Sequence, residues 1–349
     1  MMYSMRALIL RGPSHSEDPR LDIADMPVPT PGDGEILVRV SVCGVCRTDL
    51  DILQGRIVPP RYPLIPGHQV VGRVVATAGA EASFRVGDRV GIAWIHSACG
   101  VCRWCLAGTE NLCPYFQATG CDVDGGYAEY VTVRAAFAHR IPDELTSIDA
   151  APLLCAGAIG WRSLRLAAPD EGEPLGLAGF GASGHLVLQL ARQRHPSSPL
   201  YVFARDAGDR AFARELGAAW VGDFGDAPPR RMSAIIDTTP AWKPMVSTLR
   251  HLAPGGRFVI NAIRKAQADH EELARLDYAR DLWMERDVKS VANVTRRDVR
   301  EVLDVAAESG VRPTVEELPL DRGNEALARM HRGGAIRGAI VLRVSPPSR

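Results

Sequence analysis

The chain has 349 residues, of which 46% are hydrophobic and 23% are charged, values typical of globular proteins. Its 41 basic and 41 acidic side chains cancel, so charge gives no reason to expect nucleic acid or an anionic membrane as a partner. This length exceeds what one hydrophobic core usually serves, so we expect two domains.

The amino terminus and the cysteine content predict a cytoplasmic protein. Residues 1–10 lack a charged region followed by a long apolar run and a cleavage site, so we interpret them as a first strand and not as a signal peptide. No apolar run approaches the roughly twenty residues that span a bilayer. Eight cysteines are too few for a disulfide scaffold, and their clustering suits a reducing compartment.

Glycine and proline interrupt a series of short strand-like segments in residues 1–155, which predicts a β-rich first domain. Residues 35–42 have the composition of a strand, and a helix is expected after Cys46. Further strands are expected at residues 70–75, 89–94 and 127–133.

Four cysteines fall within fifteen residues of this domain, at Cys99, Cys102, Cys105 and Cys113. The spacing C-x2-C-x2-C-x7-C provides four thiolates, which suffice to close a tetrahedral zinc site. Free thiols or disulfides are the alternative, but this density of cysteines favours a metal. Such a closed site is structural because it leaves no position for a substrate, so any chemistry must lie elsewhere.

The pattern changes near Cys155 to alternating strands and helices, which predicts a doubly wound parallel sheet. Strands are expected at residues 200–203, 234–236, 257–260 and 288–291, and helices at residues 157–164, 185–192, 211–216 and 245–252. Beyond residue 292 we expect one helix at residues 298–308 and a closing strand at residues 338–342.

Gly179, Gly181 and Gly184 form a G-x-G-x-x-G motif between an expected strand and an expected helix. Such glycines allow a tight turn and bring a pyrophosphate close to the amides of a helix N-terminus. A glycine-rich turn that only packs strand on helix is the alternative. The surrounding strand–turn–helix pattern favours dinucleotide binding.

Cys46, His68 and Cys155 are a second candidate ligand set, dispersed along the chain. Two thiolates and an imidazole would leave zinc one open position, which is typical of a catalytic site. Spacing alone cannot assemble these residues, and each one singly is better explained as a buried thiol or a turn histidine.

The order of several motifs is similar to that of the medium-chain zinc-dependent alcohol dehydrogenases, over essentially the full chain. These motifs are Cys46-Arg47-Thr48-Asp49, Gly67-His68, Gly87-Asp88-Arg89-Val90, the four-cysteine loop, Gly125-Gly126-Tyr127-Ala128-Glu129 and Cys155-Ala156-Gly157. The resemblance implies an α/β protein with a GroES-like catalytic domain at residues 1–155 and 292–349. It implies a Rossmann coenzyme domain at residues 156–291.

The resemblance also implies roles for individual residues. It assigns Cys46, His68 and Cys155 to a catalytic zinc, and Cys99, Cys102, Cys105 and Cys113 to a structural zinc. It implies that Thr48 passes the alcohol proton, that Arg47 and Arg337 lie near the coenzyme pyrophosphate, and that Asp49 orients His68. Trp94 falls where the family has an aromatic wall of the substrate pocket, although a core aromatic explains this residue equally well.

Two positions depart from the family pattern. Gln69 stands where many relatives have a glutamate, which removes a carboxylate near the zinc. Asp51 stands where many have a relay histidine, and it either accepts the proton or faces solvent. Cys43 and Cys121 have no role in this scheme, and we interpret both as buried thiols.

The coenzyme specificity depends on the end of the strand at residues 200–203. An NAD site usually has an acidic residue there, which binds the ribose hydroxyls, but this chain has Phe203 and Ala204 followed by Arg205. Arg205 could pair with the 2′-phosphate of NADP, which we slightly favour. The alternative is that Arg205 faces solvent and Asp206 binds the ribose.

These features predict a zinc-dependent dehydrogenase that interconverts a primary alcohol and an aldehyde with NAD(P), holds two zinc ions per chain and forms a homodimer or homotetramer. A polyol or sugar dehydrogenase is an alternative. A non-catalytic, zinc-stabilised nucleotide-binding protein is another, but such a protein need not retain Cys46, Thr48, His68 and Cys155 together.

Overall fold

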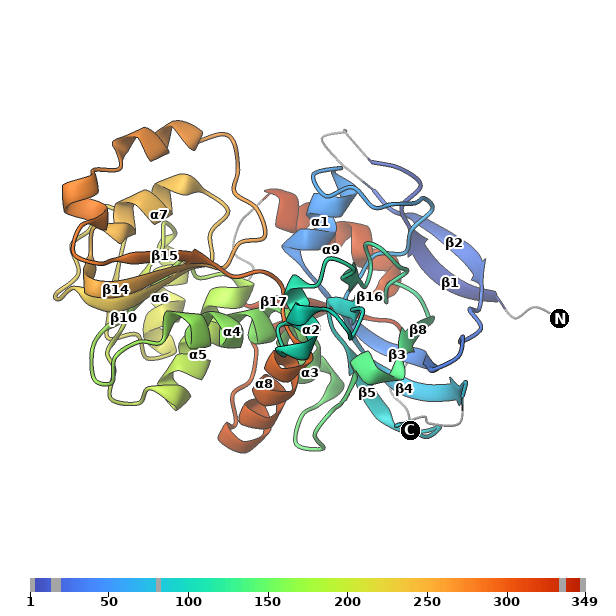
Figure 1. Ribbon diagram of the computed structural model, residues 1–349. Helices are drawn as coiled ribbons and strands as arrows, with labels where there is room; N and C mark the ends of the chain where they lie inside the picture. The colour runs from blue at the N-terminus through green and yellow to red at the C-terminus, as the bar shows by residue number, and fades with distance from the viewer. Residues whose placement is uncertain (1–3, 14–19, 80–82, 333–336, 346–349) are drawn as a thin grey trace. The chain divides into compact units, whose positions relative to one another are not determined.

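The computed structural model describes residues 4–13, 20–79, 83–332 and 337–345 (Figure 1). The chain forms two compact units, one of Met1–Cys155 with Asn293–Arg349 and the other of Ala156–Ala292. Residues 1–3 of the expected first strand lie outside the described residues. Ala292, which we expected in the first domain, belongs to the second unit. Among the described residues, no helix is both long and apolar enough to cross a membrane.

A seven-stranded sheet organises the first unit around its longest strand, β3 (Glu35–Val45). This strand is rich in β-branched residues and mostly buried, and three other strands pair with it in antiparallel fashion. The strand order is β16-β17-β3-β4-β5-β9, with β8 also paired to β3. The other strands are β4 (Gln69–Thr77), β5 (Arg89–Ile92), β8 (Tyr130–Arg134), β9 (Ala138–Arg140), β16 (Val315–Pro319) and β17 (Ala339–Arg343).

The carboxyl-terminal segment returns to this unit and completes its sheet. Strand β17 pairs with residues 42–45 of β3, and β16 pairs in parallel with β17. Helix α8 (Arg296–Ser309) starts at a capping box in which the Thr295 side chain and the Asp298 side chain bind each other's backbone N–H groups. It ends at Gly310, whose φ of 71° suits a left-handed helix cap.

The remaining elements of the first unit are short. Two two-stranded sheets pair β1 (Ser4–Ile9) with β2 (Asp22–Pro27) and β6 (Ile95–Ser97) with β7 (Gln117–Ala118). The helices are α1 (Arg47–Leu53), α2 (Arg103–Leu106), α3 (Ser147–Pro152) and α9 (Gly323–Arg332). Short 3₁₀ helices are η1 (Glu110–Leu112), η2 (Ala135–Phe137) and η6 (Leu320–Arg322).

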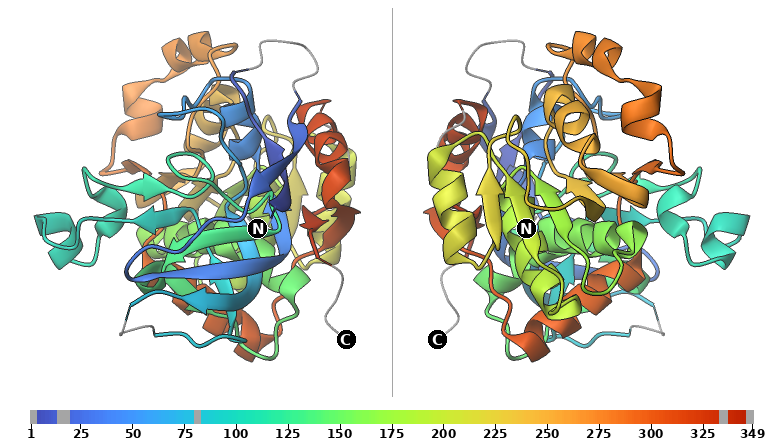
Figure 2. Two further views of the ribbon diagram at one scale, coloured as in Figure 1. Left: turned by 90° about the vertical axis from the view of Figure 1, so that its right-hand side faces the viewer. Right: turned by 90° about the vertical axis from the view of Figure 1, so that its left-hand side faces the viewer.

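The second unit is built on a six-stranded parallel sheet of order β12-β11-β10-β13-β14-β15, with helices on both sides (Figure 2). Numbered from its first strand, this is the 3-2-1-4-5-6 order of a Rossmann fold. The strands are β10 (Leu175–Ala178), β11 (Leu200–Phe203), β12 (Trp220–Gly222), β13 (Met232–Asp237), β14 (Leu252–Ile260) and β15 (Asp287–Ser290). The helices are α4 (Ala158–Ala167), α5 (Ala182–Arg194), α6 (Ala207–Glu215), α7 (Trp242–Leu249), the 3₁₀ helix η4 (His270–Arg275) and the π turn η5 (Tyr278–Leu282).

Every residue of β10, β11 and β13 is buried, as expected for strands covered on both faces. The expected fold class, a GroES-like domain with a doubly wound parallel sheet, is therefore confirmed. The prediction of one helix and one strand after residue 292 was wrong, because α9 and β16 are also present. The expected helix at residues 245–252 was placed too late, since α7 is Trp242–Leu249 and Leu252 begins β14.

Candidate metal centres and coenzyme loop

The fold brings Cys46, His68 and Cys155 together within the first unit, and their ligand atoms all lie within 4.8 Å of one another. Cys46 is the N-cap residue of α1, and His68 immediately precedes β4. Cys155 lies in η3 (Leu153–Gly157), a single π-helical turn of a kind that is frequent at functional sites. The two sulfur atoms are 3.9 Å apart.

The Asp49 carboxylate holds the His68 ring in place. Its Oδ1 lies 3.1 Å from His68 Nδ1, while Oδ2 accepts hydrogen bonds from Cys46 N at 2.8 Å and from the Tyr127 hydroxyl at 2.9 Å. Both His68 and Asp49 are essentially inaccessible to solvent. Since Nδ1 is used, the other ring nitrogen, Nε2, remains available, and it has no hydrogen-bond partner among the described residues.

The electrostatics of this cluster favour a cation. A hydrogen bond from Cys155 is the largest influence on Cys46 and holds the pKa of that thiol well below its usual range, while the same bond raises the pKa of Cys155. Burial lowers the pKa of His68, but Asp49 and Cys46 outweigh burial and raise it to about 10. Two sulfurs and one imidazole suit zinc and leave it an open position, so the donor set fits a catalytic metal that would displace these protons.

The four cysteines of the loop at residues 99–113 also converge, with their sulfur atoms all within 4.8 Å of one another. Backbone N–H groups point at these sulfurs, including Cys102 N toward Cys99 Sγ at 3.4 Å. The N–H groups of Val101 and Cys102 lower the pKa of the Cys99 thiol to about 6, which favours a thiolate. No disulfide links any of the cysteines in the described structure, and the set fits a closed tetrahedral zinc site.

A buried glutamate ties the four-cysteine loop to the start of α8. Both the backbone N and the Nε of Arg296 donate to Glu110 Oε1, each at 3.1 Å. The guanidinium of Arg296 also lies 4.7 Å from the centre of the Phe137 ring. A carboxylate is favourable at a helix N-terminus, so Glu110 stabilises both segments. Sequence reasoning missed this contact because 186 residues separate its partners.

The other residues expected at the catalytic site lie on α1 or beside it. Arg47 is exposed and Thr48 is partly exposed in the first turn of α1. The solvent-facing alternative for Asp51 was wrong: this carboxylate is buried, and Arg56 Nε donates to its Oδ1 at 2.5 Å. Trp94 is buried with its ring edge-on to His68, at a centroid distance of 4.8 Å.

The glycine loop follows β10 in the second unit and matches the shape of an anion cradle. Gly179 has a φ of 88°, and a Cβ there would meet Thr239 Cγ2 at 2.7 Å. A Cβ at Gly184 would meet Gly179 O at 2.6 Å, whereas a Cβ at Gly181 would meet no described atom within 4 Å. Gly181 is the N-cap of α5 and offers no side-chain cap, so the first amides of this helix are suited to a pyrophosphate.

Arg205 and Asp206 are both exposed in the turn between β11 and α6, so the structure leaves both coenzyme alternatives open. Arg210 Nη1 donates to the carbonyl oxygens of Ala204 and Arg205, each at 2.7 Å, which places a second guanidinium at this turn. Sequence reasoning missed Arg210, although its position one helical turn after Asp206, the N-cap of α6, is a usable signal. Arg337, also exposed, lies two residues before β17 in the first unit.

Comparison with known proteins agrees with this geometry. The family model for the alcohol dehydrogenase GroES-like domain matches residues 32–143, and the one for zinc-binding dehydrogenases matches residues 217–342. A probable alcohol dehydrogenase, AdhA of Mycobacterium tuberculosis, is 40% identical over 346 residues, which cover 98% of each chain. An alcohol dehydrogenase of Geobacillus stearothermophilus is 36% identical and covers 93% of this chain and 96% of its own.

The chain belongs to the medium-chain zinc-dependent alcohol dehydrogenase family. The structure of a cinnamyl alcohol dehydrogenase from Sorghum bicolor is similar, with a TM-score of 0.82, 26% identity and 98% coverage of both chains. A zinc-binding dehydrogenase of Sinorhizobium meliloti, bound to NADP, shares the fold with a TM-score of 0.85 at 24% identity, covering 98% of this chain and 100% of its own. This chain is thus a zinc-dependent oxidoreductase that uses a nicotinamide coenzyme and acts on a small-molecule alcohol.

Three further buried residues of the first unit, Gln69, Cys43 and Cys121, have no assigned role at either metal site. Gln69 is buried at the start of β4, and a Cβ at Gly44 would meet its Oε1 at 2.7 Å, so its amide is confined against β3. Cys43 and Cys121 are both buried, as we expected. Burial raises the pKa of the Cys121 thiol to about 12 and raises that of Cys43 well above its usual range.

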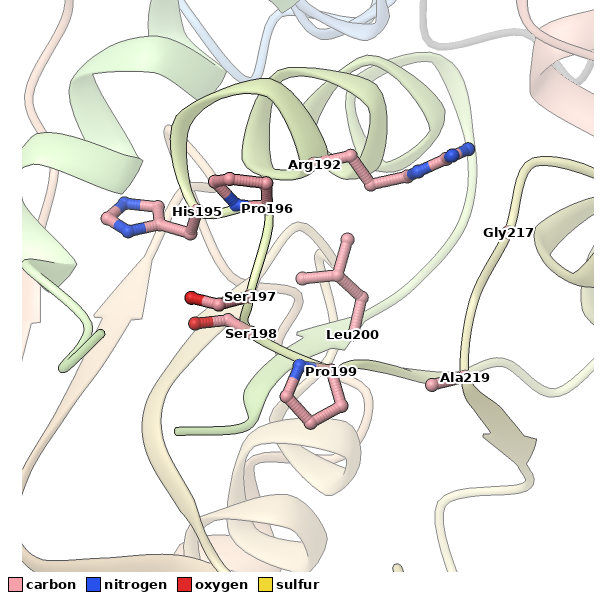
Figure 3. Close-up of a pocket in the computed structure, with 9 residues that line it drawn as sticks. All are labelled: Arg192, His195, Pro196, Ser197, Ser198, Pro199, Leu200, Gly217 and Ala219. Atoms are coloured by element: carbon pink, nitrogen blue, oxygen red, sulfur yellow. The ribbon is translucent and has the colours of Figure 1, made fainter. Parts of the chain in front are cut away.

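A cavity of about 390 Å³ in the second unit lies away from the coenzyme loop of the dehydrogenase (Figure 3). Its lining includes the end of α5 at Arg192 and His195 and the first residue of β11, Leu200. Ligands of open α/β sheets bind outside the carboxyl ends of the strands, and Leu200 is at the amino end of its strand. This cavity is therefore not the expected coenzyme site.

Proposed function

We propose that the enzyme interconverts a primary alcohol and the corresponding aldehyde, with the metal and the alcohol held by the first unit and NAD(P) by the second. The observation that carries this proposal is that the ligand atoms of Cys46, His68 and Cys155 lie within 4.8 Å of one another, while His68 Nε2 has no hydrogen-bond partner among the described residues. Zinc held by these three residues would supply a Lewis acid for the alcohol oxygen, and NAD(P) would supply the hydride acceptor.

The residues of the chain itself hold the reactants and move the proton. The Thr48 hydroxyl, one residue into α1 from Arg47, is the group we assign to pass the alcohol proton onward. Asp51 lies one turn further along the same helix and is the candidate acceptor, with Arg56 keeping its carboxylate paired. Trp94 provides an apolar wall beside the metal site, which excludes water and favours a compact primary alcohol.

We assign two zinc ions to each chain, a catalytic one at Cys46, His68 and Cys155 and a structural one at Cys99, Cys102, Cys105 and Cys113. Gly179, Gly181 and Gly184, all in the second unit, would let a coenzyme pyrophosphate come close to the backbone. Arg205, supported by Arg210, favours NADP over NAD, because a guanidinium pairs with the 2′-phosphate.

We also infer a homo-oligomer in the cytoplasm. Strand β15 is the last strand of its sheet, all of its residues are exposed, and Trp283, Met284 and Val288 expose more than a third of their surfaces there. An edge with unpaired backbone groups and apolar side chains supports pairing with a second copy, as a dimer or within a tetramer. Free cysteines that suit a reducing compartment support the location.

The proposal is tested by following coenzyme reduction at 340 nm with matched primary, secondary, polyol and sugar alcohols, each with NAD and with NADP. We expect the highest kcat/KM with primary alcohols. His68→Ala is the negative control. A preference for polyols would move the enzyme to the alternative class. Coenzyme reduction by none of these alcohols would overturn the proposal.

A further inference from the structure

Tyr127 is the most deeply buried of the described tyrosines of the first unit, and none of the roles assigned above uses its hydroxyl. The side chain has no exposure to solvent, and its hydroxyl donates a hydrogen bond to Asp49 Oδ2 at 2.9 Å. The residue lies far from the metal ligands in sequence, in the segment just before β8. Two further contacts fix its backbone, since Tyr127 N donates to Pro66 O and Leu8 N donates to Tyr127 O.

The hydroxyl completes the hydrogen bonds of the Asp49 carboxylate. Oδ1 faces His68 Nδ1, and Oδ2 accepts from Cys46 N and from Tyr127. Both carboxylate oxygens of Asp49 thus have hydrogen-bond partners, and these partners fix the orientation of the carboxylate plane. A carboxylate in this position selects the His68 tautomer with hydrogen on Nδ1, which leaves the lone pair of Nε2 for a metal.

The ring of Tyr127 fixes the backbone that carries His68. Gly67 precedes His68 with a φ of 95°, and a Cβ at Gly67 would meet the Tyr127 ring carbon Cδ1 at 2.5 Å and Cys43 Sγ at 2.9 Å. The ring therefore lies closely against this glycine, where no side chain fits. One residue thus contacts both the backbone before His68 and the carboxylate that holds its ring.

We propose that Tyr127 is a positioning residue for the metal, acting on His68 through Asp49 and through Gly67. The inference rests on the proposed function, because the proposed function assigns the catalytic zinc to Cys46, His68 and Cys155. Residues behind a metal ligand commonly change metal affinity by about 10–100-fold when they are replaced. The hydroxyl and the ring make separate contributions, and substitution by phenylalanine removes only the first.

The test is the rate at which a chelator removes zinc from wild type and from Tyr127→Phe, followed with a colorimetric chelator and without substrate or coenzyme. Wild type should release zinc in two phases, and His68→Ala, which lacks the open site, identifies the phase that belongs to it. We expect Tyr127→Phe to accelerate that phase about 10–100-fold and to leave the four-cysteine phase unchanged. Tyr130→Phe is the matched control, three residues away, and should behave as wild type.

A second variant separates positioning from a general loss of structure. In the Asp49→Asn background the hydroxyl loses its charged partner, so adding Tyr127→Phe should accelerate release much less than it does in wild type. Equal release from Tyr127→Phe and wild type would overturn the inference. So would equal acceleration of both zinc phases together with a lower melting temperature of the metal-free protein, which would show a structural role.

The same experiment distinguishes this failure from failure of the proposed function. If wild type binds zinc at the four-cysteine loop alone, the proposed function fails. If wild type holds zinc at both sites and Tyr127→Phe changes neither rate, only the role of Tyr127 fails.

Discussion

Lys265 and Asp237 form an ion pair in the interior of the second unit, with Nζ 2.5 Å from Oδ2 and side chains that are 7% and 0% exposed. The ammonium group also donates to the carbonyl oxygens of Thr239 and Ala241, each at 2.9 Å. All three of its protons are thus used. Thr239 lies against Gly179, so this pair supports the turn beneath the coenzyme loop.

Replacing Lys265 with methionine should destabilise the enzyme by about 3–5 kcal/mol, because the Asp237 carboxylate would remain buried without its partner. The double variant Lys265→Met/Asp237→Asn should recover much of that loss, since no buried charge remains. Denaturant unfolding followed by tryptophan fluorescence measures both. Equal destabilisation of the single and double variants would show that the ion pair itself is not what holds this turn.

The two metal centres should respond differently to loss of a ligand. Cys102→Ser should lower the melting temperature and remove one of about two zinc equivalents, because metal binding at a closed site stabilises the fold. His68→Ala should remove the other equivalent and abolish turnover with much less loss of stability. Zinc analysis and thermal unfolding check this. One equivalent in wild type, or turnover by His68→Ala, would contradict the assignment.

Arg205→Ala should lower kcat/KM for NADP. The loss should correspond to about 1.5–3 kcal/mol of transition-state stabilisation, the range for a hydrogen bond to a charged group. NAD should be nearly unaffected, because it lacks the 2′-phosphate. Arg210→Ala is an informative companion, since that side chain also holds the turn through two carbonyl oxygens. A wild type that strongly prefers NAD, with an unchanged Arg205→Ala, would refute the assignment.

Asp51→Asn should slow alcohol oxidation most at low pH, where solvent is the poorer acceptor for the proton. Asp51→His should introduce an ionisation near pH 6.5, the ordinary value for histidine. Arg56→Met tests whether the ion pair matters, because it leaves the carboxylate in place without its partner. Unchanged pH–rate profiles in both Asp51 variants would show that the proton leaves by another route.

His139 should make the protein acid-labile. Burial, together with the charges of Arg300 and Arg296, lowers the pKa of His139 to about 3. Between about pH 6.5 and pH 3, His139 is therefore protonated in the unfolded chain but neutral in the folded protein. Stability is therefore lost as the pH falls from 6.5 toward 3, by about 2 kcal/mol at pH 5.

His139→Leu should lose about 2 kcal/mol less stability than wild type between pH 8 and pH 5, measured by denaturant unfolding at each pH. His331→Gln, at an exposed histidine, is the matched control and should follow wild type. A parallel loss of stability in His139→Leu and wild type would assign the acid lability to other groups.

The sequence predicted the parts of the molecule that depend on local patterns. The four cysteines lie on one loop, so their spacing alone indicated a cluster, and the glycine motif lies between a strand and a helix as expected. Cys46, His68 and Cys155 could be grouped only through the family resemblance, because tertiary folding brings them together. For the same reason neither the Tyr127 contact to Asp49 nor the burial of Asp51 was predicted.

Helix boundaries were less well predicted, because capping and tertiary packing decide them. The helix expected at residues 211–216 begins at Ala207, close behind the N-cap Asp206. Helix α9 was missed, although its apolar residues Ala326 and Leu327 are buried. Its apolar and charged residues lie on opposite sides of the helix, so the amphipathic signal is present in the sequence and we overlooked it.

The return of the chain to its first unit has a consequence for biosynthesis. The second unit is one continuous segment and can finish folding while the first still lacks β17, the strand that pairs with the end of β3. The partner of Glu110, Arg296, is synthesised 186 residues later. This delay lasts roughly 10–40 s at ordinary rates of translation. During that interval the nascent chain carries an open sheet edge, so the half that is translated first is the last to become native.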